Sequence, residues 1–301
     1  MRKPLFGIDR RTLRNMRKHR FLYLLFLPIA AYFALFSYYP FVKGIIMSFQ
    51  ANRLIGKRPF VGLQNYATVI ADADFIRSIV NSLVIGLADL ALYFLLSLLL
   101  ALMINELVRR LAQKTVQTIA YLPYLFAWSV IGGIWVLIFH NKGIVNHLAA
   151  LIGMKPVYFL SESGWSRPLV IGMGVWRSIG YYALLYIVAI FGISPSLYEA
   201  AQIDGASRFK LIRRIIVPSL YDTMKVMIVL LAIGVLTHFD EMYVMQNSVN
   251  KSHIMTLLLY IFETGILKFK MGIATAGAAL VMIGTLVLVW VIRKLVRYDT
   301  I

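Results

Sequence analysis

The chain has 301 residues, of which 60% are hydrophobic and only 15% are charged. An ordinary soluble domain is about 25% charged, so this chain has too little polar surface to coat a water-soluble globule, and lipid is the expected solvent for much of it. The net charge of +18 comes mostly from basic residues between long apolar runs, a pattern typical of loops facing the cytoplasm and anionic headgroups rather than nucleic acid. Cysteine is absent, which excludes disulfides, thiolate zinc sites and cysteine nucleophiles.

Six apolar segments follow one another along the chain. A bilayer core about 30 Å thick needs roughly 20 apolar residues of helix to cross it. The first segment follows basic residues but is longer than the apolar core of a signal peptide, so we expect a retained helix. The sequence predicts an all-α membrane protein with six transmembrane helices, at about residues 21–40, 81–104, 116–139, 168–191, 223–242 and 272–292.

The distribution of Lys and Arg predicts how these helices are oriented. With the N-terminus inside, the inside segments carry basic residues at more than twice the density of the outside segments. We therefore expect both termini in the cytoplasm, a basic N-terminal tail over residues 1–20 and one transmembrane domain over residues 21–301. The sequence shows no repeat that would divide this domain.

The connection between the fourth and fifth segments, residues 194–220, has a pattern too regular for a simple loop. Residues 198–203 favour a short helix, which Asp204 and Gly205 break. Residues 206–216 predict a second, basic amphipathic helix that Pro218 ends. A rigid helix pair at the cytoplasmic surface suits docking to a partner that pushes on the membrane domain.

Two short runs and a proline in this loop stand at a characteristic spacing: Glu199-Ala200-Ala201, Asp204-Gly205-Ala206 and Pro218. Their order and spacing resemble the EAA loop of permeases in binding-protein-dependent ABC importers. The likeness is closest to the sugar-importer branch, which includes the maltose system, and it covers roughly residues 20 to 295. Further residues that fit this branch are Trp176, Gly180, Tyr181, Phe239 and the run GLQNY from Gly62 to Tyr66.

The resemblance implies the type I ABC importer permease fold in a multi-pass protein of a bacterial cytoplasmic membrane. It implies two cytoplasmic ABC ATPase subunits as partners, one of which holds the first helix of this loop in a cleft, with the coupling residues Glu199, Ala200, Ala201, Asp204 and Gly205. Further implied partners are a second permease, expected to be a different polypeptide, and an extracellular solute-binding protein. Because the sequence has no Gly-x4-Gly-Lys-Ser/Thr run, ATP and Mg²⁺ are expected on the partners, with no cofactor and no enzymatic activity in this chain.

Ionisable residues inside apolar segments are costly and usually face a bundle interior, a partner or a cavity. Asp89 lies in the second segment and Arg177 in the fourth, while a polar group with Asp240 closes the fifth. By resemblance to the maltose-type subunit, the sugar-contacting positions are Gly174, Arg177, Ser178, Tyr181, Gly234, Thr237, His238 and Glu241. The family is rich in asparagine at the helix-five positions, where this chain has Thr237, His238 and Glu241, and this leaves the identity of the sugar open.

Two interpretations of Arg177 remain. If its guanidinium faces substrate, a carboxylated sugar such as a uronic-acid oligosaccharide gains a bidentate partner. Alternatively, Arg177 forms a buried pair with Asp89 or extends to the outer interface.

The expected function is that of a permease subunit that translocates an oligosaccharide by alternating access, driven by partner ATPases. A permease for a non-sugar solute remains an alternative, as does a secondary transporter, although the latter usually shows an internal repeat. A membrane enzyme would need clustered catalytic groups, which Asp89 and Arg177 alone do not make, so no catalytic residue is assigned. No metal site is predicted either, because the remaining histidines are scattered without metal-ligand spacing: His19, His140, His147 and His253.

Overall fold

The computed structural model describes residues 19–53 and 56–298, and over these ranges the chain is helical, with one isolated bridge between Gln50 and Phe60 as its only β pairing. The predicted all-α class is therefore confirmed. Most of the predicted basic tail over residues 1–20 lies outside the described residues.

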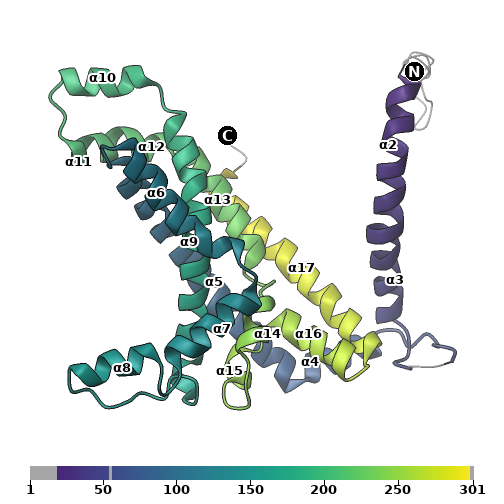
Figure 1. Cartoon of the computed structure of the whole chain (residues 1–301). Helices are drawn as coiled ribbons and strands as arrows, with labels where there is room; N and C mark the ends of the chain where they lie inside the picture. Colours follow the sequence, from purple (N-terminus) through teal and green to yellow (C-terminus); the bar gives the residue numbers. More distant parts are fainter. Residues whose placement is uncertain (1–18, 54–55, 299–301) are drawn as a thin grey trace.

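Five helical stretches of the described chain are long and apolar enough to cross a membrane, and a bent pair adds a sixth if it is counted as one span. The five stretches are α2 to α3 (Arg20–Phe33, Tyr39–Ser48), α5 (Ala73–Asn105), α7 to α8 (Trp128–Phe139, Ile144–Leu151), α9 (Ser166–Phe191) and α17 (Met271–Leu295). The bent pair joins Arg208–Ser219 to α13 (Tyr221–Gly234) at an angle of 61°. Figure 1 shows these helices with the short elements α4 (Gln64–Ala71), α6 (Arg110–Tyr121), α10 (Pro195–Ile203), α14 (Asp240–Met245), α15 (Lys251–Ile254) and α16 (Leu257–Phe262) between them.

Two prolines that were expected to end helices do not. The first helix continues beyond Pro40 to Ser48, and the second helix of the 194–220 loop, which starts at Arg208, continues through Pro218 to Ser219. In both cases a π-helical turn comes directly before: η1 (Ala34–Tyr38) and η4 (Ile212–Ile216). Proline cannot donate the i to i−4 hydrogen bond and its ring clashes with the carbonyl of residue i−4. A widened turn just ahead of the ring removes that conflict, so the helix carries on.

Two predicted helices are interrupted where the sequence analysis placed continuous spans. The third, over residues 116–139, divides into α6, the 3-10 turn η2 (Leu122–Leu125) with Pro123 in it, and α7. The fifth, over residues 223–242, ends at Gly234, and a non-helical stretch leads to α14. Backbone at membrane depth can leave the helix only where neighbouring groups satisfy its amides and carbonyls, and both breaks lie beside polar side chains.

Close backbone contacts hold the centre of the molecule together. Helices α5 and α9 pack along much of their length; α5 contributes to all three apolar clusters of the core and α9 to two of them. A Cβ on Gly86 of α5 would lie 2.2 Å from the Val235 carbonyl oxygen, and one on Gly180 of α9 would lie 2.0 Å from the Ala120 carbonyl oxygen. Only glycine permits these approaches, which bring α5 to the break after α13 and α9 to α6.

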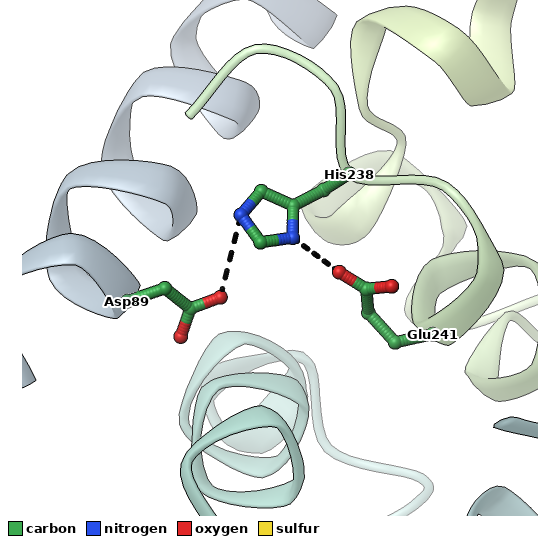
Figure 2. Close-up of side chains that lie close together, drawn as sticks. All are labelled: Asp89, His238 and Glu241. Atoms are coloured by element: carbon green, nitrogen blue, oxygen red, sulfur yellow. Dashed lines mark hydrogen bonds and ion pairs between the residues drawn. The ribbon is translucent and has the colours of Figure 1, made fainter. Parts of the chain in front are cut away.

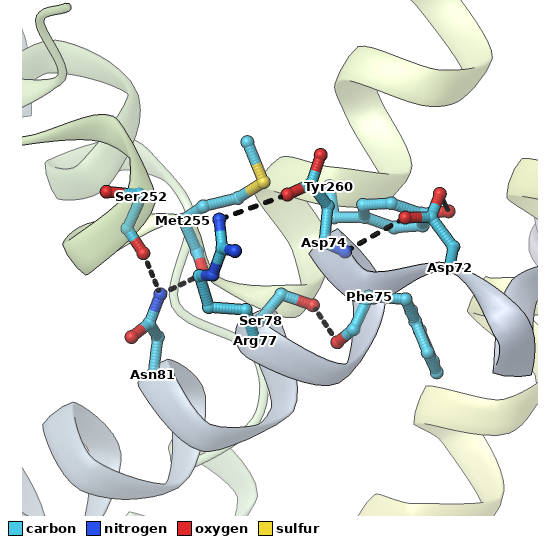
Figure 3. A network of polar contacts seen from close by, with 9 residues as sticks. All are labelled: Asp72, Asp74, Phe75, Arg77, Ser78, Asn81, Ser252, Met255 and Tyr260. Carbon is cyan, nitrogen blue, oxygen red and sulfur yellow. Dashed lines mark hydrogen bonds and ion pairs between the residues drawn. The ribbon is translucent and has the colours of Figure 1, made fainter.

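Polar contacts fix the beginning of α5 against the segments before α17 (Figure 3). The Asp72 carboxylate accepts hydrogen bonds from the Asp74 amide (2.9 Å) and from the Tyr260 hydroxyl (2.7 Å). Burial opposes ionisation of Asp72, but these hydrogen bonds and the charge of Lys268 hold the pKa of its carboxyl below the usual value. About two turns after Asp74, the Asn81 side chain donates to the Met255 carbonyl oxygen (2.9 Å) and so joins α5 to α15 and α16.

Helix α2 stands apart from the rest of the molecule (Figure 1). No residue of α2 or of η1 is buried, and this stretch touches the core through α3, which packs on α17. Its apolar side chains are therefore left for lipid or for another protein chain to cover.

Candidate functional site

The break after α13 places a histidine between two buried carboxylates (Figure 2). The imidazole Nδ1 of His238 pairs with the Glu241 carboxylate, and its Nε2 lies 3.6 Å from Asp89 Oδ2. The Thr256 hydroxyl donates to the His238 carbonyl oxygen (2.7 Å), which satisfies the backbone where the helix is interrupted. The break thus delivers His238 and Glu241 to the middle of α5.

This ion triad is almost completely enclosed. Asp89 is 2% exposed and Glu241 is 5% exposed, and Asp89 Oδ1 is buried without a hydrogen-bond partner in the described chain. One nitrogen and two carboxylate oxygens from the three residues lie within 4.8 Å of one another. The contact between His238 Nδ1 and the Glu241 carboxylate is direct and leaves no space for an ion between them. The geometry therefore suits an ion triad that ties α5 to the break.

Two of the predicted residues on α9 complete the surroundings of the triad. A Cβ on Gly174 would lie 2.4 Å from the Tyr93 hydroxyl and 3.6 Å from Asp89 Oδ2, so only glycine fits there. Ser178 is buried beside Tyr93. Tyr93 was not among the site residues predicted from the sequence. The signal that could have found it is its position four residues after Asp89, which places both side chains on the same helix face.

Arg177 belongs to a different group, at the break of the third span. Its Nη2 donates to the Tyr124 and Phe126 carbonyl oxygens (3.2 Å each), and its Nε donates to Phe126 (3.3 Å). The guanidinium carbon lies 4.2 Å from the centre of a Trp128 ring and 4.8 Å from that of Tyr124. Within the described chain no ion pair joins Arg177 to Asp89, so the expected alternative of such a pair is wrong.

A row of tyrosines connects the arginine group to the triad. Tyr181 stacks on Tyr124 with ring centres 4.2 Å apart, and Tyr182 contacts Tyr181 edge-on at 5.1 Å. Tyr182 also stacks on Tyr93 at 5.4 Å. The predicted residues Arg177 and Tyr181 thus lie at one end of this row, and Gly174, Ser178, His238 and Glu241 lie at the other.

The remaining two predicted residues lie at the break itself. Gly234 is the last residue of α13, and a Cβ there would meet no atom within 4 Å. Thr237 is exposed, and its hydroxyl donates to the Ile233 carbonyl oxygen (3.0 Å) in the preceding turn. Neither residue joins the triad through a side-chain contact in the described chain.

The short helix α10 and its turn form the second candidate site, at the far end of the molecule (Figure 1). Gly205 has φ +65°, and its amide donates to the Gln202 carbonyl (3.1 Å) while the Ala206 amide donates to the Ala201 carbonyl (2.9 Å). This pair of bonds is a Schellman motif, which requires the left-handed residue that glycine supplies.

Opposite faces of α10 serve different contacts. Ala201 is buried in the core cluster that includes the ends of α5 and α9, whereas Glu199, Ala200 and Asp204 are exposed. Beyond them, Ile203 is 87% exposed and Phe209 is 71% exposed. The turn therefore exposes two large apolar side chains next to exposed polar residues.

Comparison with known proteins gives consistent matches along the chain. Residues 93–297 match the family described as binding-protein-dependent transport system inner membrane component. The polygalacturonan/rhamnogalacturonan transport system permease protein YteP of Bacillus subtilis (strain 168) is 30% identical over 298 residues, which span 96% of this chain and 91% of YteP. The diacetylchitobiose uptake system permease protein NgcF of Streptomyces coelicolor is 29% identical over 304 residues, spanning 95% and 85% of the two chains.

Among solved structures, a similar chain occurs in a bacterial ABC transporter involved in the import of the acidic polysaccharide alginate. The two chains superpose with a TM-score of 0.88 at 31% identity, over 95% of this chain and 98% of the other. A bacterial alginate ABC transporter in complex with alginate pentasaccharide-bound periplasmic protein also matches, with a TM-score of 0.88 at 30% identity over 96% and 98% of the two chains.

Proposed function

The chain belongs to the binding-protein-dependent transport system inner membrane components, and from this we infer that it is the carbohydrate permease of an ATP-driven importer whose substrate is an acidic oligosaccharide. Two of its relatives have names that refer to polymers of acidic sugars: polygalacturonan/rhamnogalacturonan for YteP, and alginate for the solved transporter. Both match this chain over at least nine-tenths of their own length.

The contacts of Arg177 are the observation on which the proposal of an acidic sugar rests. Its contacts use Nε and Nη2, and Nη1 makes no hydrogen bond within the described chain. Nη1 thus keeps its N–H groups for a ligand, and a hydrogen bond from a guanidinium to a carboxylate is strengthened by the two charges. The stacked rings of Tyr124 and Tyr181 beside it supply the flat apolar faces that sugar rings pack against. We assign the exposed Thr237, with Gly234, to the same translocation path, and we assign to its supporting wall the enclosed residues Gly174, Ser178, His238 and Glu241.

The partners proposed for this permease follow from its exposed surfaces. Two cytoplasmic ATPase subunits would carry ATP and Mg²⁺, and one of them would dock on the α10 turn, where the exposed Ile203 and Phe209 would be covered. An extracellular solute-binding protein would deliver the sugar at the opposite end. In this arrangement, residues Glu199, Ala200, Ala201, Asp204 and Gly205 transmit closure of the ATPase pair to the membrane helices.

A second permease, a different polypeptide, would complete the path. Helix α2 supports this partner, because a transmembrane helix with no buried residue lacks the packing that a polytopic chain usually gives it. The basic residues of the 194–220 loop and of the C-terminal end of α17 support a cytoplasmic location for that side of the molecule, and hence for both termini.

Uptake by the complete transporter in proteoliposomes tests the proposal. Arg177→Gln is expected to raise the KM for oligogalacturonate or oligoalginate about tenfold more than the KM for neutral oligosaccharides, the effect of losing one charged hydrogen bond to the carboxylate. Arg177→Lys keeps the charge but not the planar guanidinium donors. Its KM for the acidic oligosaccharides should therefore lie between that of the wild type and that of Arg177→Gln. A wild-type transporter that prefers neutral sugars would rule out the acidic substrate, and uptake that continues without ATP would rule out the importer.

A further inference from the structure

Helix α8 (Ile144–Leu151) projects from the end of the molecule opposite α10 (Figure 1). It follows α7 after a four-residue connection and precedes the loop that leads to α9. Asn146, which is 5% exposed, fixes its orientation. The Asn146 side chain donates to the Val157 carbonyl oxygen (2.8 Å) and accepts from the Val157 amide (2.9 Å), so the side of α8 that carries Asn146 is turned toward its own loop.

The opposite face of α8 is apolar and uncovered. Ile144 is 59% exposed, Leu148 57%, Leu151 73% and Ile152 75%. These residues stand at positions i, i+4, i+7 and i+8, which share one face of a helix. A helix in water would carry polar residues on such a face, and four large aliphatic side chains side by side mark an interaction surface.

We propose that the face formed by Ile144, Leu148, Leu151 and Ile152 lies in the membrane, at the boundary of headgroups and acyl chains in the leaflet farther from α10. Its partner is therefore lipid hydrocarbon. The neighbouring α7 is itself an apolar helix, and its Leu137, about one turn before the connection, is likewise 73% exposed. The exposed Lys142 and Lys155 flank α8 and would reach the phosphate layer, as basic residues at the rim of interfacial helices do.

A docking protein explains the same face less well. A solute-binding protein that comes and goes leaves its docking surface in water between visits, and such transient interfaces are about as polar as the remaining protein surface. A stripe of Leu and Ile suits a permanent apolar environment instead. This inference depends on α7 crossing the membrane and not on the identity of the transported solute.

The absence of cysteine from this chain makes the test direct. Leu148→Cys and, on the exposed opposite face, Ala150→Cys would each carry a nitroxide in the complete transporter in lipid nanodiscs, with any partner cysteines replaced. Oxygen concentrates in hydrocarbon, whereas a nickel chelate stays in water. The rate at which the nitroxide collides with oxygen, divided by the rate at which it collides with the chelate, should therefore be several-fold higher at position 148 than at position 150. Leu151→Cys should repeat the result at position 148 and excludes a local effect of one label.

Equal ratios at positions 148 and 150 would overturn the proposal. So would a label at position 148 that is open to the nickel chelate until loaded binding protein is added and protected afterwards, because that outcome makes the face a protein docking surface. A high oxygen ratio that binding protein does not change would establish lipid as the partner.

Discussion

His238 stands between two buried carboxylates, so each member of this triad depends on the others. The imidazole compensates Asp89 through Nε2 and Glu241 through Nδ1, and all three side chains are withdrawn from water. Removing one partner from a buried ion pair usually costs more than the pair contributes, because an uncompensated charge is left behind.

Replacing the histidine should therefore destabilise the permease strongly. We expect His238→Ala to lower the free energy of unfolding by about 3 kcal/mol, seen as a lower midpoint of thermal unfolding in detergent. Asp89→Asn in the His238→Ala background should recover part of that loss, because it removes one of the two unpaired charges. Additive effects of the two substitutions would show that Asp89 and His238 are not coupled.

At the scale of elements, two glycines act through different physical causes. Gly205 has open space around it but a left-handed backbone, whereas Gly86 lies against the backbone of the break after α13. Substitutions at the first position strain the turn of α10, and substitutions at the second position push helices apart.

The turn after α10 should tolerate asparagine and reject valine. A β-branched residue in the left-handed region costs about 1–2 kcal/mol, while asparagine adopts it readily. We expect Gly205→Val to abolish stimulation of ATPase activity by loaded binding protein in the assembled transporter, and Gly205→Asn to retain it. If both variants respond like the wild type, the conformation of this turn does not transmit the signal.

A methyl group added at Gly86, where α5 contacts the break after α13, should destabilise the protein. A Cβ at residue 86 meets a backbone oxygen that cannot move aside, so Gly86→Ala should cost about 1–3 kcal/mol and lower the thermal midpoint. The matched control is Gly133→Ala in α7, where no atom lies within 4 Å, and where alanine should be neutral or slightly stabilising. Equal midpoints for the two variants would contradict the close approach of α5.

For the whole molecule, the two ends should face different compartments. An impermeant maleimide added to intact cells should label Asn141→Cys, in the connection between α7 and α8, and should label Arg213→Cys only after the cells are permeabilised. Both positions are exposed in the structure. The reverse pattern would invert the proposed topology and place both termini outside.

The sequence by itself determined the class of this protein, because hydrophobicity, the density of Lys and Arg and the Glu199–Gly205 run are local properties. Length and apolar content alone select helices that can cross a bilayer. Local chemistry also marked Asp89, Arg177 and His238, since an ionisable residue in an apolar segment stands out without any knowledge of its neighbours.

Only the tertiary structure decided which of these charges meet. Asp89 and His238 are far apart in the sequence, and their pairing depends on the break after Gly234 and on the approach of Gly86 to Val235. The same dependence explains the errors in helix bounds. Whether a helix stops at Pro40, Pro123 or Pro218 depends on whether a widened turn or a neighbouring donor such as Arg177 satisfies the backbone, and these are contacts that hydropathy does not record.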